Sequence, residues 1–230
     1  MTTAEFEEYC SLSSRIGKYY SSKNDGLIQR AEMLAIERAR IMNNSENKKE
    51  WLREKLVSDD FDYSLFYVGE RIFDDVKLIL SNQHNIRLHE FTARQTPNER
   101  RKLLAEFEQG EIQSLVAMKC LDEGIDVPPT RTAYFLASSG NPREFIQRRG
   151  RILRKFEGKK DAIVYDLISI PPMVFVEQGK SGEKYRAAKS AMTRELKRVR
   201  EFASMAKNKH SAMDELIDII NKLEILDKIN

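Results

Sequence analysis

With 230 residues, 41% of them hydrophobic and 33% charged, the chain is long enough for one large domain or one domain with an appendage, and apolar enough for a buried core. Its net charge of +3 neither requires nor excludes a nucleic-acid partner, so any such binding depends on local basic patches. The sequence has only two cysteines and three dispersed histidines, which predicts neither a disulfide framework nor a zinc site. It has no apolar run near the roughly 18 residues that a membrane span needs, so we expect a cytoplasmic protein without a membrane partner.

The first part of the chain, residues 1–57, is predicted to be a helical flank. Thr2 and Glu5 have the spacing of a capping box and start the first helix. Two further helical stretches follow at 27–41 and 48–56, and no strand pattern occurs in this part of the chain. We interpret it as helices packed beside a following sheet, or as a connection to something upstream.

Residues 58–170 alternate between apolar strand patterns and helical patterns. One of the helices starts at Thr96 with Glu99 in the capping-box position, and it stops at Gly110. Continuous apolar strands indicate a sheet covered on both faces, and strands alternating with helices predict a mostly parallel sheet. The predicted fold class is therefore α/β, with a mostly parallel sheet sandwiched by helices and with helical flanks. The five strand candidates are 64–68, 86–91, 114–118, 132–137 and 162–168.

Residues 171–230 return to helical periodicity. Apolar residues recur at three- and four-residue steps from Tyr185 to Val199, and again from Leu216 to Leu223. The two narrow apolar stripes with charged outer faces predict a C-terminal helical hairpin. Its apolar stripes can pack on the core of the protein or on a partner.

A basic segment at Gln147–Arg154 places four arginines in eight residues around Gly150. The preceding Asn141-Pro142 is typical of a helix start, so Gln147, Arg151 and Arg154 are expected on one helix face. Clustered guanidinium groups on one face cannot be buried without anions, which makes carboxylates or phosphates the expected neighbours. The alternative is a solvated basic helix end that complements the helix dipole.

The loop predicted after the third strand, 119–128, is a second candidate site. In open α/β sheets, ligands bind beyond the carboxyl ends of the strands. Gly124 would allow the backbone to approach a nucleotide, and Asp126 is suited to a ribose hydroxyl or to an arginine. Alternatively, Asp122 and Glu123 only cap a short helix.

Together, the segments Asp122–Pro128 and Gln147–Arg154, about twenty residues apart, resemble motifs V and VI of superfamily 2 helicases. Gln147 at the start of motif VI is similar to the branch of XPB-like repair helicases and restriction-system motors. The resemblance implies a RecA-like domain in which Arg151 and Arg154 are arginine fingers for the γ-phosphate of ATP, with Gln147 at the same interface. It also implies that Gly124 and Asp126 border the ATP.

The same resemblance, extending from about residue 64, implies contacts with a nucleic-acid backbone at motifs IV, IVa and V. The motif V sequence departs from many relatives, because Met118-Lys119 stands where they have a Thr-Asp pair. For Thr92, the alternative is a turn residue ahead of the helix at Thr96. The implied contact residues are Gly69, Thr92, Arg94, Lys119 and Cys120.

The motifs that hold ATP and magnesium in such motors are absent from this sequence. Gly179-Lys180-Ser181 looks like the end of a phosphate-binding loop, but Val174 stands where that loop needs its first glycine. Asp214-Glu215 is followed by Leu216, which does not continue a magnesium box. We therefore expect Mg²⁺ to be held by an N-terminal motor domain that this chain lacks, with ATP shared between the two domains.

The expected function is that of the second motor domain of an ATP-dependent DNA helicase or translocase, with RNA not excluded as the track. The full-length protein would hydrolyse ATP, and the isolated chain would be inactive. One alternative is a free-standing RecA-like domain that binds nucleic acid or a partner without motor activity. Another is a small-molecule nucleotide-binding protein, which would bind nucleotide as an isolated chain.

Overall fold

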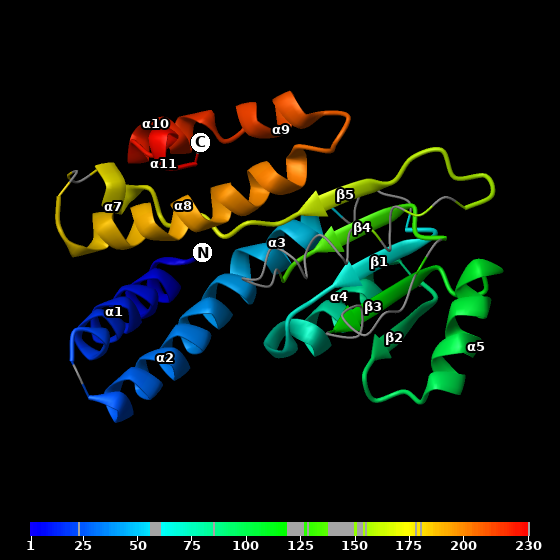
Figure 1. Cartoon of the computed structure of the whole chain (residues 1–230). Coiled ribbons are helices and arrows are strands. Elements are labelled where there is room, and N and C mark those ends of the chain that lie inside the picture. Colours follow the sequence, from blue (N-terminus) through cyan, green and yellow to red (C-terminus); the bar gives the residue numbers. More distant parts are fainter. Residues whose placement is uncertain are drawn as a thin grey trace. The chain divides into compact units, whose positions relative to one another are not determined.

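The structure, a computed structural model, describes residues 1–22, 24–55, 61–84, 86–118, 127, 129–137, 150, 154, 156–177, 179 and 181–229 (Figure 1). The chain forms two compact units. A helical unit combines Met1–Ser45 with Ile168–Asn230, and a sheet unit consists of Glu46–Leu167. The predicted limits of 1–57, 58–170 and 171–230 for the functional domains stay a prediction.

The sheet unit contains five parallel strands in the order β2-β3-β1-β4-β5. Leu65 and Phe66 are consecutive residues of β1 that point to opposite faces of the sheet, and both are fully buried. The predicted α/β class with a sheet covered on both faces is therefore confirmed. The strands are β1 (Ser64–Tyr67), β2 (Leu88–Thr92), β3 (Ser114–Met118), β4 (Thr132–Phe135) and β5 (Ile163–Asp166).

The helices of the sheet unit are α3 (Glu46–Lys55), the 3-10 helix η1 (Glu70–Ile72), α4 (Phe73–His84) and α5 (Pro97–Glu108). The predicted capping box at the start of α5 is confirmed. The Thr96 side chain accepts a hydrogen bond from the Glu99 backbone N–H at 3.3 Å, and Glu99 accepts one from the Thr96 backbone N–H at 2.7 Å. The hydrogen bonds from Thr96 lower the pKa of the Glu99 carboxyl group.

A row of stacked aromatic rings crosses three strands on one face of the sheet. Phe66 of β1 lies opposite Tyr134 of β4, which lies opposite Tyr165 of β5. The ring centroids are 4.5 Å apart for the first pair and 5.0 Å for the second, with nearly parallel planes. Trp51 of α3 packs on Tyr134 and Tyr165. Strand register and ring stacking thus reinforce each other, because residues opposite one another on one face are in contact.

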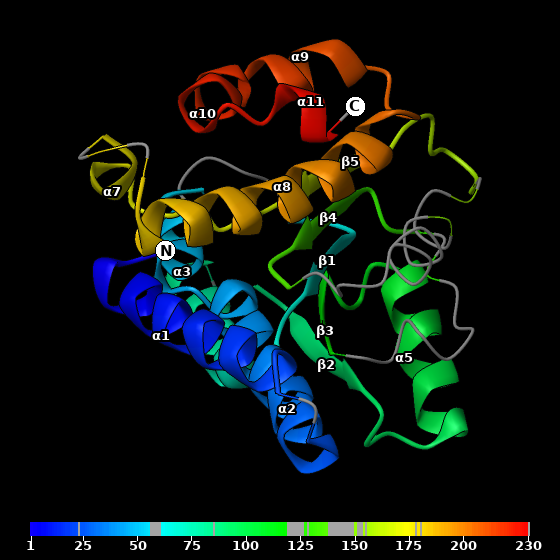
Figure 2. The ribbon, with the colours of Figure 1, turned by 60° about the vertical axis from the view of Figure 1, so that its left-hand side comes forward.

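The helical unit is formed by helices from both ends of the chain. Figures 1 and 2 show α1 and α2 side by side, and α1 also contacts α8. The C-terminal segment was predicted to be a hairpin of two helices. Its described residues form a short helix, α7, then one long helix, α8, and three further short helices. The helices are α1 (Thr3–Tyr20), α2 (Asp25–Asn43), α7 (Val174–Glu177), α8 (Glu183–Ala203), α9 (Lys209–Asp214), α10 (Ile217–Leu223) and α11 (Leu226–Ile229).

One apolar core joins most of these helices. Phe6 of α1, Met192 and Leu196 of α8, and Leu223 of α10 are all fully buried in it. The capping box predicted at the start of α1 is present. Burial raises the pKa of the Cys10 thiol, also in this core, to about 11, so the thiol stays protonated at neutral pH.

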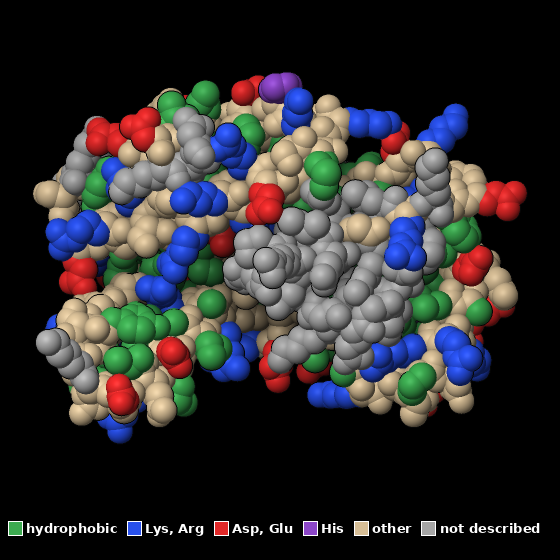
Figure 3. Space-filling view, viewed as in Figure 1, with side chains coloured by type: hydrophobic (Ala, Val, Ile, Leu, Met, Phe, Trp, Pro, Cys, Tyr) green, Lys and Arg blue, Asp and Glu red, His purple; other side chains and the backbone are tan. Residues whose placement is uncertain are grey.

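Polar contacts connect segments of the helical unit that are distant in the sequence. The amino group of Met1 donates a hydrogen bond to the Ile170 carbonyl oxygen at 2.8 Å, and the Ser169 hydroxyl donates one to the Met42 carbonyl oxygen at 2.7 Å. The Tyr185 hydroxyl donates to the Leu223 carbonyl oxygen at 3.1 Å. Lys and Arg side chains gather over α8 on the face seen in Figure 3. Among the described helices, none has the length and apolar character needed to cross a membrane.

Candidate nucleotide and nucleic-acid interface

The carboxyl ends of the strands form one edge of the sheet, because all five strands are parallel. Gly69 follows β1, Thr92 ends β2 and Lys119 follows β3 in the sequence. These three strands are direct neighbours in the order β2-β3-β1. The predicted nucleic-acid residues are therefore distributed over three adjacent strand ends, which is where ligands bind in open α/β sheets.

The exit from β1 is held by the neighbouring strand. Val68 is buried and its backbone N–H donates to the Ala117 carbonyl oxygen at 2.9 Å. Gly69 follows in an extended conformation with φ −80° and precedes η1, and the Ile72 N–H donates to its carbonyl oxygen at 3.3 Å. Gly69 is half-buried, so its backbone is accessible at the strand end.

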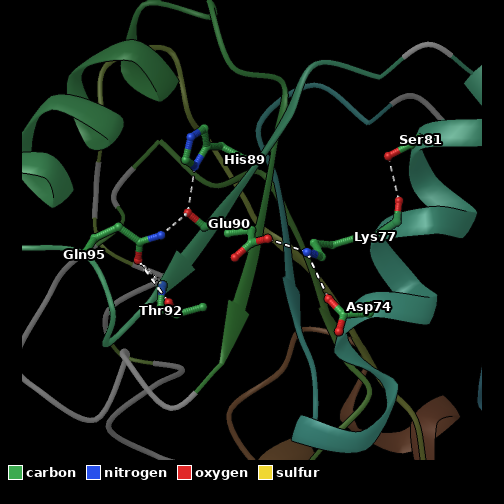
Figure 4. Close-up of polar contacts among 7 residues, drawn as sticks. All are labelled: Asp74, Lys77, Ser81, His89, Glu90, Thr92 and Gln95. Carbon is green, nitrogen blue, oxygen red and sulfur yellow. Dashed lines mark hydrogen bonds and ion pairs between the residues drawn. The ribbon is translucent and has the colours of Figure 1, made fainter.

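At the exit from β2, the Gln95 side-chain amide bridges two backbone groups of the strand (Figure 4). Its Oε1 accepts hydrogen bonds from the Thr92 backbone N–H at 2.7 Å and from the Thr92 hydroxyl at 3.1 Å. Its Nε2 donates to the Glu90 carbonyl oxygen at 3.3 Å. The amide thus forms the hydrogen bonds that a further strand would form with this part of β2.

The backbone groups that Gln95 binds lie on the free edge of the sheet. The Arg87 carbonyl oxygen accepts a hydrogen bond from the Ser114 N–H of β3, so Arg87 directs its backbone groups toward β3. Backbone groups of successive residues in a strand alternate in direction, which places those of Glu90 and Thr92 on the opposite side. Because β2 is an edge strand, Gln95 covers groups that would otherwise be open to another strand.

Thr92 and Arg94, two predicted contact residues, have different surroundings. The Thr92 side chain is only 2% exposed, and its hydroxyl oxygen accepts a hydrogen bond from the Arg94 backbone N–H at 3.2 Å. The hydroxyl is thus engaged within the turn in this structure, in line with the alternative that Thr92 is a turn residue. Arg94 is exposed at the same turn.

An ion-pair cluster beside β2 was not anticipated from the sequence. Lys77 of α4 pairs with Glu90 of β2 and, at 3.0 Å, with Asp74 (Figure 4). The hydrogen bonds from Lys77 to Glu90 and Asp74 raise the pKa of Lys77. The i,i+3 spacing of Asp74 and Lys77 was the available sequence signal, whereas Glu90 is brought in by the fold.

These residues border an open hollow of about 540 Å³ between α4 and β2. Lys77 is the only lysine or arginine among its lining residues, and both of its carboxylate partners lie there too. Carboxylates therefore outnumber the lysine in this hollow, which makes it poorly suited to a phosphate group. The lining residues are Asp74, Lys77, Leu78, Ser81, Leu88, His89, Glu90 and Gln95.

Of the residues predicted to serve ATP, the structure describes Arg154. Arg154 is exposed, and its carbonyl oxygen accepts a hydrogen bond from Lys159 Nζ at 3.3 Å. Burial lowers the pKa of Lys159. The other predicted residues of this group and of the motif V contacts lie outside the described residues: Lys119, Cys120, Gly124, Asp126, Gln147 and Arg151.

The group that these residues are predicted to serve is ATP with Mg²⁺. An exposed guanidinium such as that of Arg154 fits a phosphate by charge and by its planar array of donors. In the part of the chain that the structure describes, no cluster of three or more His, Cys, Asp or Glu side chains could hold a metal ion. One described cation, Arg154, thus has the chemistry that a phosphate group requires.

The fold and the strand-end residues define an α/β domain of the RecA-like class. The SWI2/SNF2 ATPase core domain of Sulfolobus solfataricus has a similar fold, with a TM-score of 0.53 and 13% identity over 81% of this chain and 44% of that one. Residues 47–156 match the family described as "Helicase conserved C-terminal domain". This segment, just under half of the chain, is therefore similar to the C-terminal domain of helicases, in agreement with the predicted resemblance to superfamily 2 helicases.

Two curated relatives agree with the XPB-like branch. The DNA 3'-5' translocase XPB2 of Sulfurisphaera tokodaii is 32% identical over 129 residues, which cover 55% of this chain and 27% of that protein. The putative DNA 3'-5' helicase Rad25 of Haloarcula marismortui is 41% identical over 66 residues, or 28% of this chain and 11% of that protein. The matched segments thus span about a quarter or less of the length of these relatives.

Proposed function

We propose that this chain acts as the second motor domain of an ATP-dependent superfamily 2 DNA helicase or translocase. The observation that carries the proposal is the family match at 47–156, which covers the first four strands of the sheet and the loops that follow them. DNA is chosen over RNA because the XPB2 relative is named as a DNA translocase. Its ATP site would be shared with an N-terminal motor domain.

In this proposal, Arg151 and Arg154 place their guanidinium groups against the terminal phosphate of ATP. Phosphoryl transfer needs little covalent assistance but strong neutralisation of charge, and a planar guanidinium can hold two oxygens at once. Gln147 lies at the same interface, while Gly124 and Asp126 border the nucleotide. ATP supplies the phosphoryl group and Mg²⁺ would be held by the N-terminal domain.

The strand contacts would come from the carboxyl ends of β1, β2 and β3. Gly69 offers backbone groups, Arg94 and Lys119 offer cations, and Cys120 lies next to Lys119. Such contacts with a phosphate backbone carry no sequence information, which suits a protein that moves along its track. Thr92 would act mainly by holding the turn that presents Arg94, because its hydroxyl is hydrogen-bonded within that turn.

The test compares DNA-stimulated ATP hydrolysis by this chain and by a protein extended upstream in its gene. We expect hydrolysis only in the extended protein. There, Arg151→Ala or Arg154→Ala should lower ATP turnover by about 10³-fold or more while largely sparing DNA binding. Arg30→Ala is the matched control, because Arg30 is an exposed arginine on α2, outside the family match.

Three results would contradict parts of this proposal. If both arginine variants hydrolyse ATP at the rate of the unmodified protein, Arg151 and Arg154 are not arginine fingers. ATP hydrolysis by this chain alone would mean that it contains a complete nucleotide site. DNA binding without hydrolysis in the extended protein would favour a free-standing binding domain.

A further inference from the structure

The outward face of α8 carries a row of basic side chains, Arg186, Lys189, Lys197 and Arg200, which we call the basic row. Their separations of three, eight and three residues keep them on one side of a helix with 3.6 residues per turn. The opposite side of α8 packs into the core through Ala188, whose side chain is fully buried. At about 1.5 Å per residue, the row is about 21 Å long.

Other basic residues of α8 have partners within the protein. Lys184 pairs with Glu7 of α1 at 2.9 Å, and Arg194 donates a hydrogen bond to the Tyr9 hydroxyl at 2.5 Å. Arg198 is buried and pairs with Glu195 at 2.9 Å. These contacts hold α8 in the helical unit and account for three of its seven basic residues.

Most of the basic row lies open to solvent. Arg186 and Lys197 are exposed, and in the described part of the chain neither forms an ion pair. Lys189 is half-buried and lies over the ring of Tyr185, with its Nζ 5.7 Å from the centroid. The acidic residues on α8 are Glu183 and Glu201 near its two ends and Glu195, which pairs with Arg198. The row is therefore a local excess of positive charge on a chain whose net charge is only +3.

We propose that the basic row binds the phosphate backbone of a nucleic-acid strand, as a contact separate from the strand ends of the sheet. The inference rests on the proposed function, since it takes nucleic acid as the track. The basic row is about 21 Å long, and nucleotides in one strand of a duplex are about 3.4 Å apart along the axis. The row therefore matches the length of roughly six nucleotides. Contacts with phosphate groups carry no sequence information, so this contact has no sequence preference.

The surroundings of the row favour nucleic acid over an acidic protein. Protein interfaces have an apolar centre. None of the large apolar side chains of α8 is exposed, because Tyr185, Met192 and Leu196 are all buried and the remainder are at least half-buried. The Thr193 hydroxyl on this face donates to the Lys189 carbonyl oxygen at 2.8 Å, so the donors offered to a ligand are the cations. A polyanion matches such a surface.

The test measures the salt dependence of DNA binding by the full chain. One variant combines Arg186→Ala, Lys189→Ala and Lys197→Ala. The control combines Arg15→Ala, Lys18→Ala and Arg30→Ala, which removes the same charge from exposed positions of α1 and α2. Binding of a labelled oligo(dT) strand is followed by fluorescence anisotropy over a series of KCl concentrations, and far-UV circular dichroism checks that both variants keep their helices.

For the basic-row variant, we expect the slope of log Kobs against log salt to decrease in magnitude by about 2, at roughly 0.7 per lost phosphate contact on a single strand. The control should keep the slope of the unmodified chain. An unchanged slope in the basic-row variant, or an equal decrease in the control, would overturn the proposal. Unaltered DNA binding together with lost capture of an acidic protein would also overturn it.

This outcome is separable from that of the proposed function. A decreased slope in the basic-row variant supports the basic row even if the upstream-extended protein fails to hydrolyse ATP. If the extended protein hydrolyses ATP in the presence of DNA but the slope of the basic-row variant is unchanged, the motor function is supported and the proposed role of the basic row is overturned. A chain that binds no nucleic acid at all would overturn the basic row directly.

Discussion

At the residue scale, Gln95 shows how one side chain can organise a strand end. Its amide bridges the Glu90 carbonyl oxygen and the Thr92 backbone N–H on the free edge of β2. It also accepts from the Thr92 hydroxyl, which in turn accepts from the Arg94 backbone N–H. The chain of hydrogen bonds sets the turn from which Arg94 projects. Thr92, predicted to touch nucleic acid, is in this structure an internal member of that chain.

Replacing Gln95 by leucine should therefore destabilise the sheet unit. Leu has a similar size but no hydrogen-bonding groups, so the buried Thr92 N–H and hydroxyl would lose their acceptor. The expected loss is about 1–3 kcal/mol in the free energy of unfolding. Urea unfolding followed by Trp51 fluorescence measures it, because Trp51 lies in the sheet unit. The exposed Gln109→Leu control should change stability by less than about 0.5 kcal/mol, and equal effects of both variants would contradict the role of Gln95.

At the scale of single elements, α3 shows how a polar helix can belong to a core. Its sequence is mostly charged, and periodicity places it in the N-terminal flank. In the structure, Leu52 is fully buried and packs in the core of the sheet unit. Lys48 donates to the Leu136 carbonyl oxygen at 2.6 Å, and Lys49 pairs with Asp75 at 2.7 Å. Both lysines lie in a charged stretch for which the sequence predicts solvent exposure, but in the structure they are buried and connect α3 to its neighbours.

Lys49 illustrates the balance of such a contact. Burial alone lowers the pKa of Lys49, but hydrogen bonds to Asp75 and Glu46 outweigh this effect, so the pKa is raised. A lysine with a raised pKa in the folded state stabilises the fold below its ordinary pKa, and this contribution is lost as the pH rises through the folded-state pKa. At neutral pH, Lys49 therefore carries its positive charge.

Truncation of the apolar anchor of α3 tests whether this helix stabilises the sheet. Leu52→Ala should lower the free energy of unfolding by about 2–5 kcal/mol, since it removes a buried side chain and leaves a cavity. The exposed Glu50→Ala is the control on the same helix and should have an effect within about 0.5 kcal/mol. Urea unfolding monitored by Trp51 fluorescence compares them. A Leu52→Ala variant as stable as the control would mean that α3 is only loosely associated.

At the scale of the whole molecule, the two ends of the chain form one helical unit. Phe6 near the N-terminus lies in the same core as Met192 and Leu223. The Met1 amino group and the Ile170 carbonyl oxygen add a hydrogen bond between residues 169 positions apart. The sheet unit is consequently inserted between two segments that fold together. A change near the N-terminus should therefore affect the C-terminal helices.

The variant Phe6→Ala tests this arrangement. Loss of a fully buried phenylalanine should destabilise the helical unit by about 3–5 kcal/mol. Far-UV circular dichroism should show early loss of helix during urea unfolding, whereas the transition reported by Trp51 in the sheet unit should move much less. Glu8→Ala, an exposed position on α1, is the control. An equal shift of both transitions would show that the two units unfold together.

The sequence by itself determined the local and periodic features of this protein. Five apolar strands in alternation with helices predicted the parallel sheet, and the capping boxes at Thr2 and Thr96 were recognised from spacing, because a cap involves residues only three apart. The order of the segments at 122–128 and 147–154 pointed to superfamily 2 helicases, which the family match at 47–156 confirms.

Only the tertiary structure decided which distant segments share a core. Local periodicity does not encode the contacts by which α3 packs on the sheet or those by which the N- and C-terminal helices share a core. It also does not encode the hydrogen bonds between Gln95 and Thr92. Amphipathic helices specify that they have a buried face, but many partners could cover it. The physical reason is that burial of apolar area is non-directional, so the choice of partner emerges only when all elements pack together.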